Sequence, residues 1–277
     1  MERVTVLAAT GRLGQVLVRR LRSAGVPVVA VGRDPARLAA LPEDVERRVA
    51  DFGDAPALAA ALADARLVVS CANAVFAPSI LAALPGGVER LVLMGSTRRF
   101  SRVPDGTATS VRAAEAALAR LSVPSVMLLA TMIYGAGGSV VDMLAAKLQR
   151  FPVLPLPGGG KSLVQPIHIE DVAAALAAAL SRPEAPGAPI VIAGPRPMPY
   201  GEMVRIVARA HRVRVMILPV PAFLVAAAAG LAGLAGPLRE FAQSLNRLLE
   251  DKDFDIAEMR LRLGVEPRDF VPGDTIG

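Results

Sequence analysis

The chain has 277 residues, 53% of them hydrophobic, and a net charge of +6. This length allows one large domain, or a large domain with a smaller lobe. Cys71 is the only cysteine, so an internal disulfide and a cysteine-based metal site are excluded, and we expect a cytoplasmic protein. With only two histidines, no metal site is expected. The basic residues lack interleaved aromatic residues, which argues against nucleic-acid binding.

A glycine-rich turn follows the first predicted strand, at 4–8, and leads into a helix predicted over 13–24. Glycines in such a turn let backbone amides approach a pyrophosphate, and the helix N-terminus adds partial positive charge. An alanine replaces the first glycine of the G-x-x-G-x-x-G pattern, and we interpret it as a tolerated variant. The turn is predicted to bind a dinucleotide through Ala8, Thr10, Gly11, Arg12, Leu13 and Gly14.

Strands and helices continue to alternate through residue 130. Such alternation predicts an α/β fold with a doubly wound parallel sheet of the Rossmann type. Further strands are predicted at 26–32, 46–50, 67–71, 90–95 and 125–130, and helices at 35–41, 55–62, 78–84 and 110–121.

The pattern changes after residue 133. Glycine and proline clusters in 134–166 predict a loop region that faces an active site. A helix is predicted over 169–180, with two acidic residues at its N-terminus, and a seventh strand over 188–193. We therefore assign residues 1–133 and 165–194 to a dinucleotide-binding domain, and residues 134–164 and 195–277 to a smaller, mostly helical lobe.

One uncharged stretch, 215–238, is long enough for a membrane span. Prolines near both ends and three glycines interrupt it, so we expect a buried helix of the smaller lobe and no transmembrane span. The alternatives are a subunit interface or a peripheral contact with the inner face of a membrane.

Three arginines gather around the end of the second predicted strand. Arg33 follows that strand directly, and Arg37 lies one helical turn later. Arginine at this corner accommodates the 2′-phosphate of NADP, whereas an acidic residue binds the ribose of NAD. Together with Arg12, these guanidiniums favour NADP(H) over NAD(H). Alternatively, Arg33 is a solvated loop residue and Asp34 caps the following helix.

The third and fourth predicted strands end in further candidate cofactor contacts. Asp51 and Phe52 are predicted to bracket an adenine ring, with Asp51 accepting from its amino group or instead capping the next helix. Cys71, Ala72 and Asn73 are expected beneath the adenosine ribose and the pyrophosphate.

These motifs resemble the short-chain dehydrogenase/reductase superfamily, in its extended or atypical branch, over nearly the whole chain. AATGRLG at 8–14 resembles the glycine-rich motif, and LVLMGST at 91–97 resembles the fifth strand with its terminal serine. QPIHIEDVA at 165–173 is similar to a motif of the branch that contains nucleotide-sugar epimerases and the accessory NADPH-binding subunit of respiratory complex I. The resemblance implies that Thr131 lines the cofactor site, and that helices beside the fourth and fifth strands form a homodimer contact.

The catalytic Tyr-x-x-x-Lys pair of this superfamily is absent, because neither tyrosine has a lysine four residues later. Arg112 is the candidate for the ribose-binding role of the lysine, and an alanine stands where the tyrosine belongs. Ser96 is expected to polarise a substrate carbonyl and to contact the cofactor. Tyr134 or His168 is the candidate substitute acid, although a lone histidine more often hydrogen-bonds within the structure.

Three functions remain open at this point. The leading interpretation is an NADP(H)-dependent oxidoreductase that acts on a small organic substrate. The second is a catalytically silent NADPH-binding accessory or regulatory subunit, which joins a partner protein in a larger, membrane-associated assembly. The missing catalytic pair and the uncharged stretch favour this second function. The third is a nucleotide-sugar epimerase or dehydratase, which the absent tyrosine disfavours.

Overall fold

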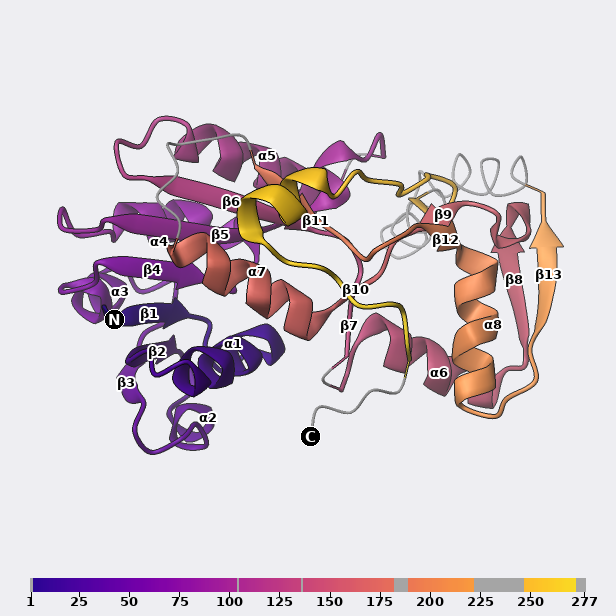
Figure 1. Ribbon diagram of the computed structural model, residues 1–277, viewed down its shortest axis with the longest axis horizontal. Coiled ribbons are helices and arrows are strands. Elements are labelled where there is room, and N and C mark those ends of the chain that lie inside the picture. The colour runs from indigo at the N-terminus through magenta and orange to yellow at the C-terminus, as the bar shows by residue number, and fades with distance from the viewer. Residues whose placement is uncertain (1, 104, 136, 182–188, 222–246, 273–277) are drawn as a thin grey trace.

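A seven-stranded parallel sheet, in the order β11-β6-β5-β4-β1-β2-β3, forms the larger part of the molecule (Figure 1). The computed structural model describes residues 2–103, 105–135, 137–181, 189–221 and 247–272. The predicted Rossmann-type doubly wound sheet is confirmed. Its strands are β1 (Val4–Leu7), β2 (Val28–Gly32), β3 (Glu46–Val49), β4 (Leu67–Ser70), β5 (Arg90–Ser96), β6 (Ser125–Ala130) and β11 (Ile190–Ile192).

Helices cover both faces of this sheet because its central strands are apolar on both sides. Val28 and Ala30 of β2 pack on one face, whereas Val29 and Val31 pack on the other. The first face is covered by α1 (Arg12–Ser23) and α7 (Ile169–Ser181), and the second by α3 (Ala55–Leu62), α4 (Ala77–Ala82) and α5 (Gly106–Leu118). The short helix α2 (Pro35–Ala39) follows β2.

Aspartates fix the start of several of these helices. Asp34, Asp54 and Asp105 accept backbone N–H groups at the N-termini of α2, α3 and α5. The cap at Asp105 starts α5 four residues before its predicted beginning at 110, because the intervening Gly-Thr-Ala-Thr segment continues the helix.

A third hydrophobic cluster forms a smaller lobe beyond the carboxyl ends of the strands (Figure 1). It contains α6 (Val140–Arg150) and α8 (Tyr200–Ala210). Two strand pairs complete it: β8 (Val153–Pro157) runs parallel to β13 (Met216–Val220), and β9 (Leu163–Val164) runs antiparallel to β12 (Met198–Pro199).

Helix α6 corrects the interpretation of 134–166 as a loop region. The Ser139 hydroxyl accepts from the Asp142 amide, and the Asp142 carboxylate accepts from the Ser139 amide, which forms a capping box. An apolar stripe of Val141, Leu144 and Leu148 faces the lobe. The flanking glycines and prolines concealed a complete helix signal.

The C-terminal segment returns from the lobe to the sheet domain (Figure 1). Ile256, Met259 and Leu263 pack in the same cluster as α1 and α7. The buried Asp171 carboxylate binds the Arg268 guanidinium at 2.9 Å and accepts from the Arg268 amide. The proposed division of the chain into two domains stays a prediction.

Most of the uncharged stretch, at 222–238, lies outside the described residues. Among the described residues, no helix is both long and apolar enough to cross a membrane.

Candidate functional site

The glycine-rich turn between β1 and α1 leaves an open helix N-terminus. Gly11 is the N-cap of α1, and no side chain caps this helix. A Cβ atom on Gly14 would stand 2.3 Å from the Ala8 carbonyl oxygen and 2.7 Å from the Ala9 Cα, so the turn requires glycine there. Unpaired N–H groups at a helix start bind anions. The turn therefore fits the pyrophosphate of a dinucleotide.

Ala8 adopts a φ of +56°, in the left-handed region that favours glycine. The alanine at the first glycine position is thus accommodated in a glycine-like backbone conformation. The cost for an L-residue is about 1–2 kcal/mol.

The arginines of the neighbouring corner have different partners. Arg37 donates to the Thr10 carbonyl at 2.7 Å. Arg12 donates to Gly135 and Gly138 carbonyls at 2.8 and 3.1 Å, which ties the turn to the loop before α6. Arg33 is exposed, with no recorded side-chain partner among the described residues.

Asp34 caps α2, as the alternative interpretation of this corner predicted. Its carboxylate accepts from the Ala36 amide at 2.9 Å. Among the described residues, no ion pair joins this carboxylate to the exposed Arg33 guanidinium.

The predicted adenine contacts, Asp51 and Phe52, follow strand β3. The Asp51 carboxylate accepts from the Gly53 amide at 2.8 Å, and Asp54 caps α3, so the expectation that Asp51 caps this helix is wrong. Phe52 stacks on Phe76 with ring centroids 4.9 Å apart. No motif in the sequence predicted this contact of Phe76.

Residues 71–73 follow β4 directly. Cys71 is partly buried, and burial raises the pKa of its thiol to about 12. The Asn73 side chain accepts from the Val75 amide at 3.1 Å and so caps the 3₁₀ turn η1 (Ala74–Phe76). Ala72 is buried, so it offers its backbone and no polar side chain.

At the corner between β5 and α5, the candidate catalytic groups bind the backbone. The Ser96 hydroxyl accepts from the Arg98 amide at the start of the 3₁₀ turn η2 (Thr97–Phe100). Arg112 donates to the Arg99 carbonyl at 2.7 and 3.0 Å and to the Ser101 carbonyl at 3.1 Å. Its guanidinium therefore holds the loop after η2.

The structure brings Tyr134 and His168 together, on the paired strands β7 (Ile133–Tyr134) and β10 (Ile167–His168). Their rings meet edge to face at 5.0 Å, and both side chains are buried. The Tyr134 hydroxyl donates to the Asp269 carbonyl at 3.0 Å, and His168 Nδ1 accepts from the Glu170 amide at 3.2 Å.

Thr131, the last predicted cofactor contact, donates its hydroxyl hydrogen to the Gln165 carbonyl at 2.5 Å. The Gln165 amide in turn donates to the carbonyls of Gly194 and Phe254. Thr131 thereby belongs to the hydrogen bonds that join β6 to the C-terminal segment.

Sequence reasoning also missed a polar cavity of about 450 Å³ between η2 and residues 247–254. Lys252 lines it and donates to the carbonyls of Arg247 and Glu250 at 2.7 and 3.0 Å. Burial lowers the pKa of Lys252 below its ordinary value. The run of charged residues in EDKDFD, at 250–255, was the available signal.

Comparison with known proteins agrees with this geometry. Residues 8–133 match a family model described as NAD(P)H-binding. Over 199 residues the chain is 30% identical to the mitochondrial NADH dehydrogenase [ubiquinone] 1 alpha subcomplex subunit 9 of Arabidopsis thaliana, a match covering 64% of this chain and 49% of that protein. The aligned region thus spans about half the length of this relative.

Solved structures share the fold. A nucleoside-diphosphate-sugar epimerase from Pseudomonas aeruginosa superposes with a TM-score of 0.74 at 19% identity, covering 97% of this chain and 93% of that one. UDP-glucose 4-epimerase from Thermus thermophilus, in complex with NAD, gives a TM-score of 0.66 at 18% identity, with coverages of 89% and 99%. The expected resemblance is confirmed: residues 8–133 match the NAD(P)H-binding family model, and the chain has the fold of the NAD-dependent epimerases.

Proposed function

We propose that this protein binds NADP(H) at the glycine-rich turn as a resident ligand and serves as an accessory subunit of a larger assembly. The main observation behind this proposal is a contrast. The N-terminus of α1 has no side-chain cap, whereas the polar side chains of the β5–α5 corner hydrogen-bond to backbone groups of the same chain. The similarity to a named subunit of NADH dehydrogenase supports the proposed partner protein.

The preference for NADP(H) rests on Arg33. Its guanidinium is exposed beside the turn, and Asp34 is held at the start of α2. A guanidinium binds a phosphate through two parallel hydrogen bonds, whereas a ribose hydroxyl offers no charge to pair. Arg12 and Arg37 hold backbone carbonyls and support the shape of the site.

The silent role rests on the candidate acids and donors. The Tyr134 hydroxyl is buried and donates to a backbone carbonyl, and Arg112 donates to two. A general acid must reach the proton acceptor within hydrogen-bond distance. Each of these groups would have to exchange a backbone partner for a substrate.

The test is a titration of the full chain with NADPH, NADH and NADP⁺, followed by nicotinamide fluorescence and calorimetry. Arg33→Ala should weaken NADPH binding about tenfold and leave NADH binding nearly unchanged, since one charged hydrogen-bonding pair is lost. Arg19→Ala, an exposed arginine on α1, is the matched control. Equal effects of Arg33→Ala on both nucleotides would contradict the NADP(H) preference.

A second candidate is an NADPH-dependent reductase of a small organic substrate, and the polar cavity with Lys252 favours it. Bound NADPH would supply a hydride. Lys252, with its lowered pKa, would hold a proton within this cavity. NADPH oxidation in the presence of small aldehydes and keto acids, abolished by Lys252→Met and retained by Lys161→Met, would establish this function over the silent one. An epimerase or dehydratase is disfavoured because Ala108 stands where the superfamily tyrosine belongs.

A peripheral membrane contact and a homodimer remain predictions of the same proposal. Sedimentation of the purified chain, with and without lipid vesicles, tests both.

A further inference from the structure

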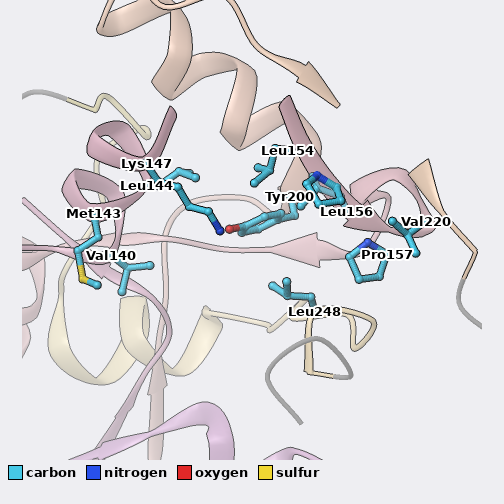
Figure 2. A pocket seen from close by; sticks show the side chains of 11 residues that line it. Val140, Met143, Leu144, Lys147, Leu154, Leu156, Pro157, Tyr200, Val220 and Leu248 are labelled. Carbon is cyan, nitrogen blue, oxygen red and sulfur yellow. The ribbon is translucent and has the colours of Figure 1, made fainter. Parts of the chain in front are cut away.

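The smaller lobe contains an open cavity of about 450 Å³ between α6, β8, α8 and β13 (Figure 2). We call it the lobe cavity. Nine of its eleven described lining residues are aliphatic, proline or methionine side chains, and the other two are Lys147 and Tyr200. Small-molecule sites typically have volumes of ~300–1,000 Å³, mostly apolar walls and a few polar groups. The lobe cavity has this composition.

The cavity has an apolar interior and a charged mouth. Leu154 and Leu156 of β8 are buried in its wall. On α6, Met143 is 69% exposed at the rim, and Lys147 is also exposed. Met143 and Lys147 are one helical turn apart, so they project from the same side of α6. A ligand that fills the cavity therefore meets hydrocarbon inside and an ammonium at the opening.

The two polar groups converge at one end. Figure 2 shows the Lys147 ammonium and the Tyr200 hydroxyl pointing toward one another. Burial raises the pKa of Tyr200, so its hydroxyl keeps its proton at neutral pH and can donate. No hydrogen bond or ion pair is recorded for either polar group within the described part of the chain. The described residues therefore provide no acceptor for these two neighbouring donors.

We propose that the lobe cavity binds a single-chain anionic amphiphile, with its hydrocarbon tail against Leu154 and Leu156 and its head group accepting from Lys147 and Tyr200. A neutral amphiphile would leave the ammonium unpaired, and a short anion would leave the apolar wall exposed to water. The site is separate from the glycine-rich turn, and the proposal does not depend on NADP(H) binding.

The test is calorimetric titration of the full chain with octanoate, decanoate and dodecanoate below their micelle concentrations. Affinity should rise roughly threefold to fourfold for each added methylene until the cavity is full. Decanol, which has the same tail and no charge, should bind about tenfold more weakly than decanoate. Dodecyl phosphate, compared with dodecanoate, identifies which anionic head the two donors prefer.

Substitutions of residues at the opening of the lobe cavity test whether decanoate binds in this cavity. Lys147→Met should weaken decanoate binding about tenfold and leave decanol binding unchanged, whereas Lys161→Met, at an exposed lysine outside the cavity, should change neither. Met143→Glu places a repelling charge at an exposed rim position, and Met143→Gln is its neutral control. Glutamate should weaken decanoate binding several-fold more than glutamine does.

Several results would overturn the proposal. They are no saturable binding of any chain length, equal affinity for decanol and decanoate, or unchanged decanoate binding in Lys147→Met. Urea unfolding of the same variants shows whether they remain folded, and this control does not depend on NADP(H) binding, so the outcome stays distinct from any failure of the cofactor site.

Discussion

The β1–α1 turn and the β5–α5 corner lie at the carboxyl edge of the same sheet, but their polar groups differ in whether they are bonded within the chain. At the β1–α1 turn, glycines leave the first amides of the helix without a side-chain cap. At the β5–α5 corner, Asp105 caps the helix, Arg98 pairs with Asp105, and Arg112 binds two carbonyls. The first corner can take up an anion without breaking an internal bond. The second would have to break several.

This difference indicates that the binding and the chemical parts of a Rossmann fold can change independently. A dinucleotide needs open amides and a close backbone approach. Proton transfer needs side chains that are free to face the substrate. In this chain the first requirement is met by backbone geometry, and the side chains that would serve the second stabilise loops. Substitutions at the two corners should therefore have different effects.

The largest effect is expected from Gly14→Ala. The new methyl group would lie 2.3 Å from the Ala8 carbonyl oxygen and cannot fit without moving the turn. We expect a loss of ~2–3 kcal/mol in unfolding free energy, as for overpacked interiors, together with weaker NADPH binding. Urea unfolding measures the loss of unfolding free energy, and fluorescence titration measures NADPH binding. Gly86→Ala is the control, because nothing lies within 4 Å of its new atom. Equal behaviour of both variants would refute the tight turn.

The next effect concerns Asp105→Asn at the other corner. Burial alone would raise the pKa of Asp105, but the Ala108 amide and Arg98 hold it below its ordinary value. Its side chain is only 9% exposed, so removing the charge should cost ~1–3 kcal/mol. NADPH affinity should change less than twofold, because this corner does not bind the nucleotide in our proposal.

The pH dependence of this variant follows from the lowered pKa. A carboxylate with a depressed folded pKa stabilises the protein above its unfolded pKa, ~3.9, and that stabilisation is lost as pH falls through the folded pKa. The stability difference between wild type and Asp105→Asn should therefore be constant from pH 5 to 7, and shrink below ~4. Asp253→Asn, at an exposed aspartate, is the matched control for the loss of a carboxylate. A difference that grows on acidification would contradict the assignment.

Sequence reasoning predicted the sheet well because buried parallel strands and helices have distinct periodicities. The strand and glycine-rich turn at residues 4–14 are correct almost to the residue. Helix α6 was missed because the glycines and prolines around it outweighed its capping box at Ser139. The glycine and proline content around α6 therefore outweighed the spacing of its capping-box residues, which by itself predicts the start of a helix.

The candidate site was harder to predict because a residue type does not reveal its partner. Arg112 has the charge to bind a ribose, but its partners are carbonyls that lie 11 and 13 residues earlier. Tyr134 has a suitable hydroxyl, but its acceptor, the Asp269 carbonyl, lies 135 residues later. Only the folded arrangement distinguishes a free donor from one that holds the chain together.

Arg112→Ala should have a smaller effect than Asp105→Asn, since the arginine is exposed. Loss of its bonds to the loop should cost ~1 kcal/mol in unfolding free energy, measured by urea titration. We expect NADPH affinity to stay within twofold. Arg120→Ala, beyond the end of the same helix, is the control. A fivefold or greater weakening of NADPH binding, seen only in Arg112→Ala, would restore the ribose-binding role and narrow the contrast between the corners.

Ala8→Gly should give the smallest effect, and one of opposite sign. The left-handed conformation costs an alanine ~1–2 kcal/mol, whereas glycine adopts it freely but loses ~0.5–1 kcal/mol of unfolded-chain entropy. The net gain in unfolding free energy should therefore be a few tenths to ~1 kcal/mol by these values. Ala40→Gly, at an exposed helix end with φ of −75°, should only destabilise. If Ala8→Gly also destabilises, contacts of the Ala8 methyl group outweigh its strain. Alanine at this position would then stabilise the turn. Only Gly11 and Gly14 would leave the amides at the N-terminus of α1 open to an anion.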